Sequence, residues 1–218
     1  AFDWSSSALG PPEGWPQWLR AAVSLMHGSG FPMFVAAGPE LGFLYNDAYR
    51  DVLGSKHPAA MGARFSEVWA EIWPDIAPLV EAALAGQASW VEDLPLVMNR
   101  HGYPEETWFT FSYAPLRDEA DAVVGLFCTC TETTARMRVE TALRESEARF
   151  RNMADHAPVM MWMTGTDGAC TYLNRRWYEF TGQSEAESLG LGWLDAVHPD
   201  DRDSSAQAFL DANARHGP

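Results

Sequence analysis

The chain has 218 residues, of which 47% are hydrophobic and 12% are aromatic, and its formal net charge is −15. This composition is sufficient for one or two domains with packed cores. The negative charge argues against sequence-independent binding to nucleic acid, which requires a surface rich in Lys and Arg. Because no run of about 18 apolar residues occurs, the sequence predicts no membrane span. With only three cysteines, it indicates a soluble, cytoplasmic protein.

The N-terminal part of the chain predicts a helix followed by a β-hairpin. An apolar stripe, with a proline suited to the first helical turn, predicts a helix from about Pro16 to His27. Extended apolar segments from Pro32 to Ala37 and from Phe43 to Asn46 flank a turn-forming stretch with two glycines and a proline. These segments therefore predict two paired strands.

Short helices and three further strands are expected next. Caps and helix breakers predict three helices, at 47–53, roughly 66–73 and 74–85. Turn signals separate three strand patterns, at 90–98, 107–115 and 123–131. In the middle strand Phe109, Phe111 and Tyr113 share one face, as in a half-buried antiparallel sheet. The sequence therefore predicts an α+β domain with a five-stranded antiparallel sheet and flanking short helices.

Residues 134–155 contain no Gly or Pro and predict a linker helix. Five residues of this helix recur at alternating spacings of four and three and so form a stripe. Ser146 is its central member, and the apolar members are Val139, Leu143, Phe150 and Met153. This spacing favours a parallel coiled coil, and therefore a homodimer. Burial of the stripe would stabilise a helix that is only marginally stable alone in water. The alternative is that the stripe packs against its own domain.

A second copy of the first pattern follows the linker. Asn174 lies 128 positions after Asn46, and each Asn ends a short apolar strand and is followed by an aromatic residue at the third position. Gly62 and Gly190 keep the same offset. A constant offset over this length indicates tandem domains. Three strands of the first copy have no counterpart before Pro218, so we expect a second domain truncated before its last three strands and belonging to a longer protein. Its hairpin would keep an unpaired edge, poorly ordered or covered by a neighbouring chain.

Local signals within the second copy are specific. Apolar runs from Pro158 to Thr164 and from Ala169 to Asn174 flank an Asp-Gly turn and predict a hairpin. Ser184 and Glu187 have the spacing of a capping box. His198 with Asp200 and Asp201 opens a helix, and adjacent residues at a helix start cannot all converge on one metal ion. We therefore expect no metal site in this cluster.

Both copies resemble PAS domains, on the phrases Tyr45-Asn46 with Tyr49 and Gly54, and Leu173-Asn174 with Trp177 and Gly182. Residues 146–151 and 193–202 are similar to the PAS repeats found ahead of bacterial sensor histidine kinases. The resemblance implies a first sensory domain at 1–133, a linker helix at 134–155 and a truncated second domain at 156–218. It implies that Asn46 and Asn174 cap the helices that follow them.

The same resemblance assigns a role to the end of the last strand of the first domain. Residues 131–134, Thr-Glu-Thr-Thr, resemble the acid-plus-Thr junction by which PAS domains grip an outgoing helix, with Glu132 in place of the more usual Asp. The resemblance further implies a sensory input module of a two-component histidine kinase that mediates dimerisation and signal relay. A response regulator would then interact with a kinase part that is absent from these residues.

No catalytic residue is expected. The sequence contains no Gly-rich phosphate loop, no Gly-x-Ser-x-Gly elbow and no His-Glu-x-x-His motif. Two alternatives to the kinase remain: the PAS input region of a cyclic-dinucleotide enzyme, and a flavin-dependent light or redox sensor.

Cofactor binding is left open by the sequence. The Asn-Cys-Arg-Phe phrase of flavin-thiol photoreceptors is absent, and the helix predicted at 74–85 has no His for haem. Flavin bound without covalent chemistry stays open, as does a chain with no cofactor. Five aromatic residues either line a ligand pocket or fill the first core: Phe34, Tyr49, Trp69, Phe109 and Phe111.

Overall fold

The computed structural model describes residue 4, residue 7 and residues 9–215. Two compact units are present, Ala1–Val139 and Glu140–Pro218, and the boundary between them falls inside one helix. Residues 1–3 and 216–218, at the ends of the two predicted domains, lie outside the described residues.

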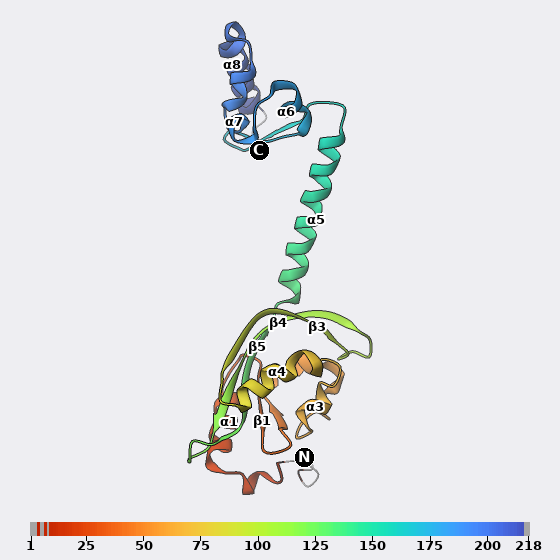
Figure 1. The fold of residues 1–218 in the computed structure, drawn as a ribbon, viewed down its shortest axis with the longest axis vertical. Coiled ribbons are helices and arrows are strands. Elements are labelled where there is room, and N and C mark those ends of the chain that lie inside the picture. The colour runs from red at the N-terminus through yellow and green to blue at the C-terminus, as the bar shows by residue number, and fades with distance from the viewer. Residues whose placement is uncertain (1–3, 5–6, 8, 216–218) are drawn as a thin grey trace. The chain divides into compact units, whose positions relative to one another are not determined.

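The first unit is built on a five-stranded antiparallel sheet, with the strand order β2-β1-β5-β4-β3 (Figure 1). The strands are β1 (Met33–Ala37), β2 (Gly42–Tyr45), β3 (Ser89–Met98), β4 (Glu105–Arg117) and β5 (Val123–Glu132). Short helices flank this sheet, so the predicted α+β, PAS-like architecture is confirmed.

The two faces of this sheet are covered differently. One face carries the short helical segments, which are η3 (Asp47–Tyr49), α2 (Arg50–Leu53), η4 (Gly54–Lys56), α3 (Phe65–Val68) and α4 (Trp73–Leu84). On the other face, α1 (Gln17–His27), which follows the short η2 (Pro12–Gly14), packs against the β1–β2 hairpin. Because both faces of the hairpin are covered, β1 and β2 are almost continuously apolar, whereas β4 alternates.

The main core is a cluster of aromatic rings between the sheet and the short helices. The ring of Phe34 lies 4.8 Å from Phe43, 4.9 Å from Phe65 and 5.3 Å from Tyr49, measured between centroids. The helix predicted at 66–73 is shorter than expected, since α3 ends at Val68. Trp69 leaves the helical conformation and is buried in this core, so tertiary packing overrides local helix propensity here.

The linker forms a single helix, α5 (Thr134–His156). After it, the second unit has a two-stranded antiparallel sheet of β6 (Trp162–Thr164) and β7 (Cys170–Leu173). The remaining elements are helical: α6 (Arg175–Thr181), α7 (Glu185–Ser188), η5 (Gly192–Ala196), η6 (Pro199–Asp201) and α8 (Arg202–Arg215). The predicted capping box of Ser184 and Glu187 is present.

The second hairpin is shorter than predicted. β6 begins at Trp162 instead of Pro158. In the first unit Met33, the equivalent of Met161, belongs to β1 and pairs with Thr129 of β5, whereas the described sheet of the second unit has only β6 and β7. The Nδ2 group of Asn174 donates to the carbonyl of Val159 at 2.9 Å, and its Oδ1 accepts from the N–H of Met161 at 3.0 Å.

One buried asparagine in each unit ties the incoming helix to the first strand. In the first unit, Nδ2 of Asn46 donates to the carbonyls of Met26 at 3.1 Å and Phe31 at 2.7 Å, while Oδ1 accepts from the N–H of Met33 at 3.1 Å. In the second unit Asn174 serves Ala154, Val159 and Met161 in the same way. Each of these three partners is shifted by the same 128 positions. The sequence repeat is therefore reproduced in three matching hydrogen bonds, and Asn46 additionally donates to the carbonyl of Ser29 at 3.2 Å.

The predicted capping role holds for Asn46 and is wrong for Asn174. Oδ1 of Asn46 also accepts from the N–H of Tyr49 at 3.2 Å, whereas the side chain of Asn174 makes no cap to α6. In the second unit the first donor of α6 is instead served by Asp155 of α5, whose Oδ1 accepts from the N–H of Arg175 at 2.8 Å. A carboxylate at this helix start also suits the helix dipole.

Replacing Asn46 with Ala is expected to lower the free energy of unfolding of the first unit by about 2 to 4 kcal/mol, because buried backbone donors and acceptors lose their partner. Urea denaturation followed by fluorescence measures this loss. The matched control is Asn99→Ala at an exposed position, which should change stability by less than about 0.5 kcal/mol. Equal losses in the two variants would contradict the assigned role of Asn46.

Candidate functional site

The core of the first unit holds a cavity of only about 30 Å³. All five predicted residues line it, together with other core side chains: Phe34, Tyr49, Trp69, Phe109 and Phe111. A cavity of this size accommodates about one water molecule, whereas cofactor pockets commonly measure several hundred Å³. In this conformation the aromatic side chains fill the core.

Two thiols and two phenols also lie in this core. Cys128 and Cys130 are neighbours on the inner face of β5, next to Tyr49 and Tyr113. Burial raises the pKa of Cys128 well above its ordinary value, and it raises the pKa values of Tyr49 and Tyr113 as well. The thiol of Cys128 and both phenols are therefore protonated and neutral at physiological pH, as expected for packing residues.

The junction between the sheet and α5 contains a buried ion-pair network. Arg100, in the turn after β3, is only 5% exposed. Its guanidinium binds both carboxylate oxygens of Glu132, at 2.7 and 2.8 Å, and its Nε donates to Oε2 of Glu105 at 3.0 Å. The hydroxyl of Thr134 donates to Oε1 of Glu132 at 2.8 Å and accepts from the N–H of Trp108 at 3.0 Å. One network thus joins the β3–β4 turn, the end of β5 and the first residue of α5.

Glu132 and Thr134 make the contact that the resemblance implied, but the sequence did not single out Arg100. Its surroundings, Asn-Arg-His-Gly, indicate only a turn. Its partner Glu132 is 32 positions away, so no local pattern signals the pair. The one sequence signal that could have pointed to Arg100 is the acid-plus-Thr junction, because a carboxylate that becomes buried there needs a cation as its partner.

The three ionisable groups of this network, Arg100, Glu105 and Glu132, are charged at neutral pH. Burial alone would raise the pKa of Glu132, but hydrogen bonds from Arg100 and Thr134 outweigh it and hold that pKa below its ordinary value. The hydrogen bond from Arg100 likewise lowers the pKa of Glu105. Burial would lower the pKa of Arg100, yet the two carboxylates raise it. Bidentate pairing of this kind fixes geometry as well as charge.

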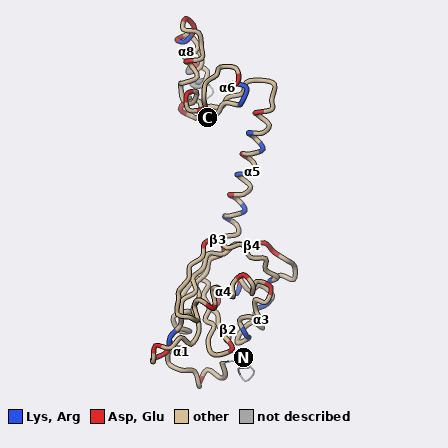
Figure 2. The backbone as a smooth tube through the Cα atoms, in the orientation of Figure 1, with Lys and Arg blue, Asp and Glu red and all other residues tan. Residues whose placement is uncertain are grey.

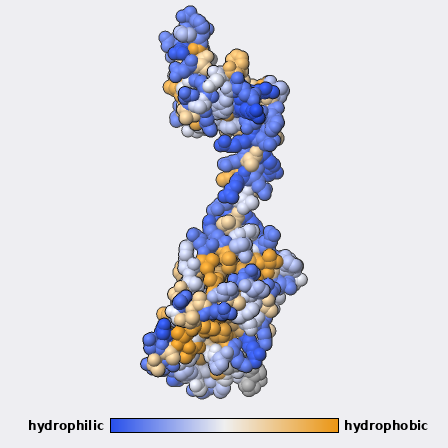
Figure 3. All heavy atoms as spheres, viewed as in Figure 1, coloured by the Kyte–Doolittle hydropathy of each residue, from blue (hydrophilic) through white to orange (hydrophobic). Residues whose placement is uncertain are grey.

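The predicted apolar stripe of α5 divides into two parts. Val139, Leu143 and Met153 are exposed, at 68%, 59% and 68% of their surface. Phe150 is half-buried, since its ring lies 5.2 Å from that of Tyr172 in the second unit. Around the stripe, basic and acidic residues are interspersed along α5 (Figure 2). On the visible face of this helix, hydrophobic residues form only small spots among hydrophilic ones (Figure 3).

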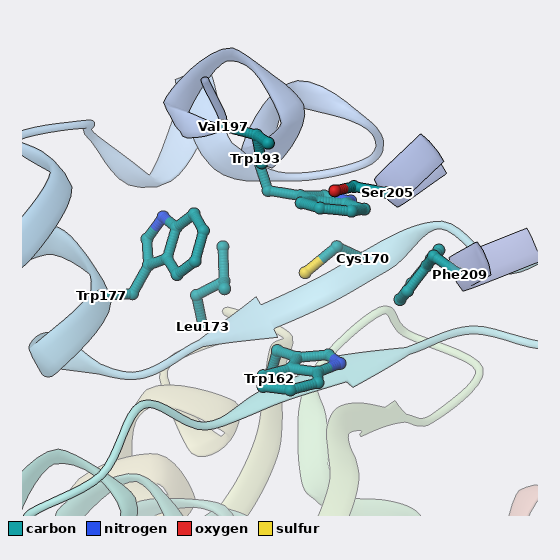
Figure 4. A pocket seen from close by; sticks show the side chains of 8 residues that line it. All are labelled: Trp162, Cys170, Leu173, Trp177, Trp193, Val197, Ser205 and Phe209. Carbon is teal, nitrogen blue, oxygen red and sulfur yellow. The ribbon is translucent and has the colours of Figure 1, made fainter. Parts of the chain in front are cut away.

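The second unit contains a larger cavity, of about 380 Å³. Its walls are mainly aromatic and apolar, and Figure 4 shows Trp162 and Trp193 on opposite sides with the sulfur of Cys170 directed between them. The remaining lining residues are Leu173, Trp177, Val197, Ser205 and Phe209. Within the described part of the chain, the buried Nε1 of Trp193 has no hydrogen-bond partner. Trp162 of the small sheet is 60% exposed beside this cavity, whereas Cys170 and Leu173 are buried.

Neither a metal cluster nor a membrane-spanning helix is found in the described residues. No group of three or more His, Cys, Asp or Glu there could hold a metal ion. At the start of η6, Nδ1 of His198 accepts from the N–H of Asp200 at 3.4 Å, a local capping contact. Among the described helices, none is long and apolar enough to cross a membrane.

Replacing Arg100 with Met is expected to destabilise the first unit at pH 7 by about 2 kcal/mol, because two carboxylates then lose their buried cation. The folded-state pKa values of Glu105 and Glu132 lie below their unfolded value of 4.5. Their stabilising contribution is therefore complete above about pH 4.5 and is lost as the pH falls through the folded-state values. The difference between wild type and variant should shrink below about pH 4.5.

Urea denaturation between pH 3 and pH 7 tests this dependence. Arg20→Met, at an exposed site on α1, is the control and should leave stability within about 0.5 kcal/mol at every pH. A difference for Arg100→Met that stays constant down to pH 3 would show that the two carboxylates are not the groups stabilised by Arg100.

Comparison with known proteins identifies the fold family of both units. A family model described as "PAS fold" matches residues 32–138, and one described as "PAS domain" matches residues 148–214. Among curated proteins, the uncharacterised protein y4lL of Sinorhizobium fredii is 43% identical over 106 residues, which are 49% of this chain and 13% of that protein. The peroxide stress-activated histidine kinase mak1 of Schizosaccharomyces pombe is 29% identical over 101 residues, 44% of this chain and 6% of the kinase.

Solved structures with a similar fold include two isolated PAS domains. The PAS domain of BvgS from Bordetella pertussis is 21% identical, with 62% of this chain and 99% of that chain covered and a TM-score of 0.43. A PAS domain from Colwellia psychrerythraea is 15% identical, with 54% and 98% covered and a TM-score of 0.42. The chain spans only a small part of its curated relatives. With both units matched by its models, the chain belongs to the PAS family and carries two PAS sensory domains in tandem.

Proposed function

We propose that this chain is the sensory input region of a bacterial histidine kinase, in which a signal detected by the PAS domains is passed along α5. The observation that carries the proposal is the attachment of α5 at both ends. Its first residue, Thr134, is bound to the Glu132–Arg100 pair of the first unit. Near its last turn, Ala154 accepts a 2.6 Å hydrogen bond from Asn174 of the second unit.

The relay begins in the filled core of the first domain. Because the core leaves only a small cavity, a ligand or a chemical change there must displace lining side chains, and these include residues of β4 and β5. Both strands contribute a residue to the Arg100 network, because Glu105 is the first residue of β4 and Glu132 is the last residue of β5. A displacement therefore reaches the first turn of α5 directly. Two discrete packings of this junction, with different affinity for the signal, would make it a switch.

Kinase output is supported by the similarity to mak1, which is itself a histidine kinase. In this proposal a cytoplasmic parent protein autophosphorylates and passes the phosphoryl group to a response regulator. Incubation of the parent protein with ATP labelled at the γ-phosphate should give an acid-labile phosphohistidine. Formation of a cyclic dinucleotide from GTP would instead favour the alternative enzyme. A flavin absorption band in the purified chain would favour the photoreceptor alternative, against which the filled core argues.

The exposed stripe of α5 is proposed to pair with the same stripe of a second copy. Leu143→Asp should convert a dimer to a monomer, because it places a charge where apolar side chains would be buried. Light scattering across a concentration series measures the mass. Ala142→Asp, one position off the stripe and exposed, carries the same charge change and should remain dimeric. A wild-type chain that is monomeric throughout would refute the pairing.

We also propose that residues 156–218 hold a PAS domain without its last three strands. Under the 128-residue offset, Trp162 and Trp193 correspond to Phe34 and Phe65. In the first unit both of these rings contact Tyr113 of β4, at 5.9 and 6.3 Å. The open cavity of the second unit thus corresponds to space that β4 and β5 fill in the first. Because β1 pairs with β5 in the first unit, strands equivalent to β5, β4 and β3 would be added at the edge of β6 that does not pair with β7.

A further inference from the structure

An irregularity in β3 places an acidic side chain beside the start of α5. Val91 pairs with Phe111 and Leu94 pairs with Phe109, so three steps along β3 match two steps along β4. One extra residue is therefore inserted, as in a β-bulge. Asp93 in this bulge has a positive φ of 49°. The bulge leaves both Val91 and Leu94 packed against the core, with Asp93 between them.

The side chain of Asp93 contacts residues at the start of α5. Its Oδ1 accepts from the hydroxyl of Thr133 at 2.7 Å, and Nη2 of Arg136 donates to Oδ1 at 2.6 Å and to Oδ2 at 2.7 Å. Its own N–H donates to Oγ1 of Thr110 on β4 at 3.1 Å. One residue thus connects β3, β4, the residue before α5 and the first turn of α5. The hydrogen bonds from Thr133 and Arg136 hold the pKa of Asp93 below its ordinary value.

The first turn of α5 needs a carboxylate that the helix itself does not supply. No acidic residue occurs in this turn, while Arg136 and Arg138 place positive charge near it. Positive charge at a helix N-terminus opposes the helix dipole, whereas a carboxylate there is favourable. Here the negative charge comes from the sheet: Glu132 binds Thr134, and Asp93 binds Thr133 and Arg136.

We propose that Asp93 is a second positioning residue of the sheet–helix junction, which fixes the first turn of α5 independently of the Arg100–Glu132 pair. The proposal deepens the relay and rests on the proposed function for its biological meaning. Arg100 approaches from the turn after β3, whereas Asp93 approaches from the bulge within β3. A shift of β3 against β4 therefore changes the two attachments by different amounts, and the first turn of α5 responds to the shear of the sheet.

Hydrogen–deuterium exchange of the whole chain tests this placement. Asp93→Asn keeps a residue type that tolerates positive φ but removes the charge. Exchange of the amides in residues 136–139 should become about threefold to tenfold faster. Exchange in β4 and β5 should stay within about twofold of wild type. Glu92→Gln, a neighbouring exposed acid, is the matched control and should leave the start of α5 unchanged.

A double-mutant cycle separates a direct pair from a general effect of charge. In an Arg136→Gln background, Asp93→Asn should produce a clearly smaller acceleration, because the ion pair is already lost and only the contact with Thr133 is left to weaken. Fully additive effects would overturn the proposal, as would unchanged exchange at 136–139 or equal acceleration throughout the sheet. The measurement requires no dimer, kinase or signal. A monomeric chain would refute the proposed pairing, and a parent protein without kinase activity would overturn the proposed function. Neither result would change the placement of Asp93.

Discussion

The carboxamide of a single buried asparagine organises each unit. Asn46 and Asn174 are 2% and 0% exposed. Each satisfies backbone groups of the incoming helix, of the connection after it and of a residue at the start of the first strand, Met33 in β1 or Met161 just before β6. Buried backbone groups without partners are costly, so these three segments cannot separate without leaving several groups unpaired. A single Asn with two donors and an acceptor therefore sets the position of the helix on the sheet in both units.

The exit from the first domain is built on different chemistry from its entry. Neutral hydrogen bonds hold α1 at Asn46, while carboxylates hold α5 through Glu132 and Asp93. The guanidinium of Arg100 is buried, so its pairs are little screened, whereas the side chain of Arg136 is 49% exposed beside Asp93. The junction thus combines one buried ion pair, which solvent and salt screen little, with one partly exposed ion pair, which they screen more.

Hydrophobic periodicity and turn residues predicted most of the helices and strands and the repeat. Such signals are local, as the alternation in β4 and the Asn-centred phrase show. Contacts between distant positions were out of reach. Arg100 looked like a turn residue, and Asp93 lay inside a predicted strand whose bulge no local pattern marks. Asn174 was expected to cap α6, yet Asp155 takes that role, since its place at the end of α5 becomes apparent only in three dimensions.

The two asparagines bind the carbonyl groups of Met26 and Ala154, which are equivalent residues. Helix α5 therefore has one structural role in each unit. For the second unit it is an incoming helix, as α1 is for the first. For the first unit it is the outgoing helix, held by Thr134. The entry contact is made by an uncharged amide, which has no titratable group. The exit contact is made by ion pairs, of Arg100 with Glu105 and Glu132 and of Arg136 with Asp93. In the proposed relay, the adjustable step would therefore lie at the C-terminal end of the first sheet, and the fixed step at Asn174.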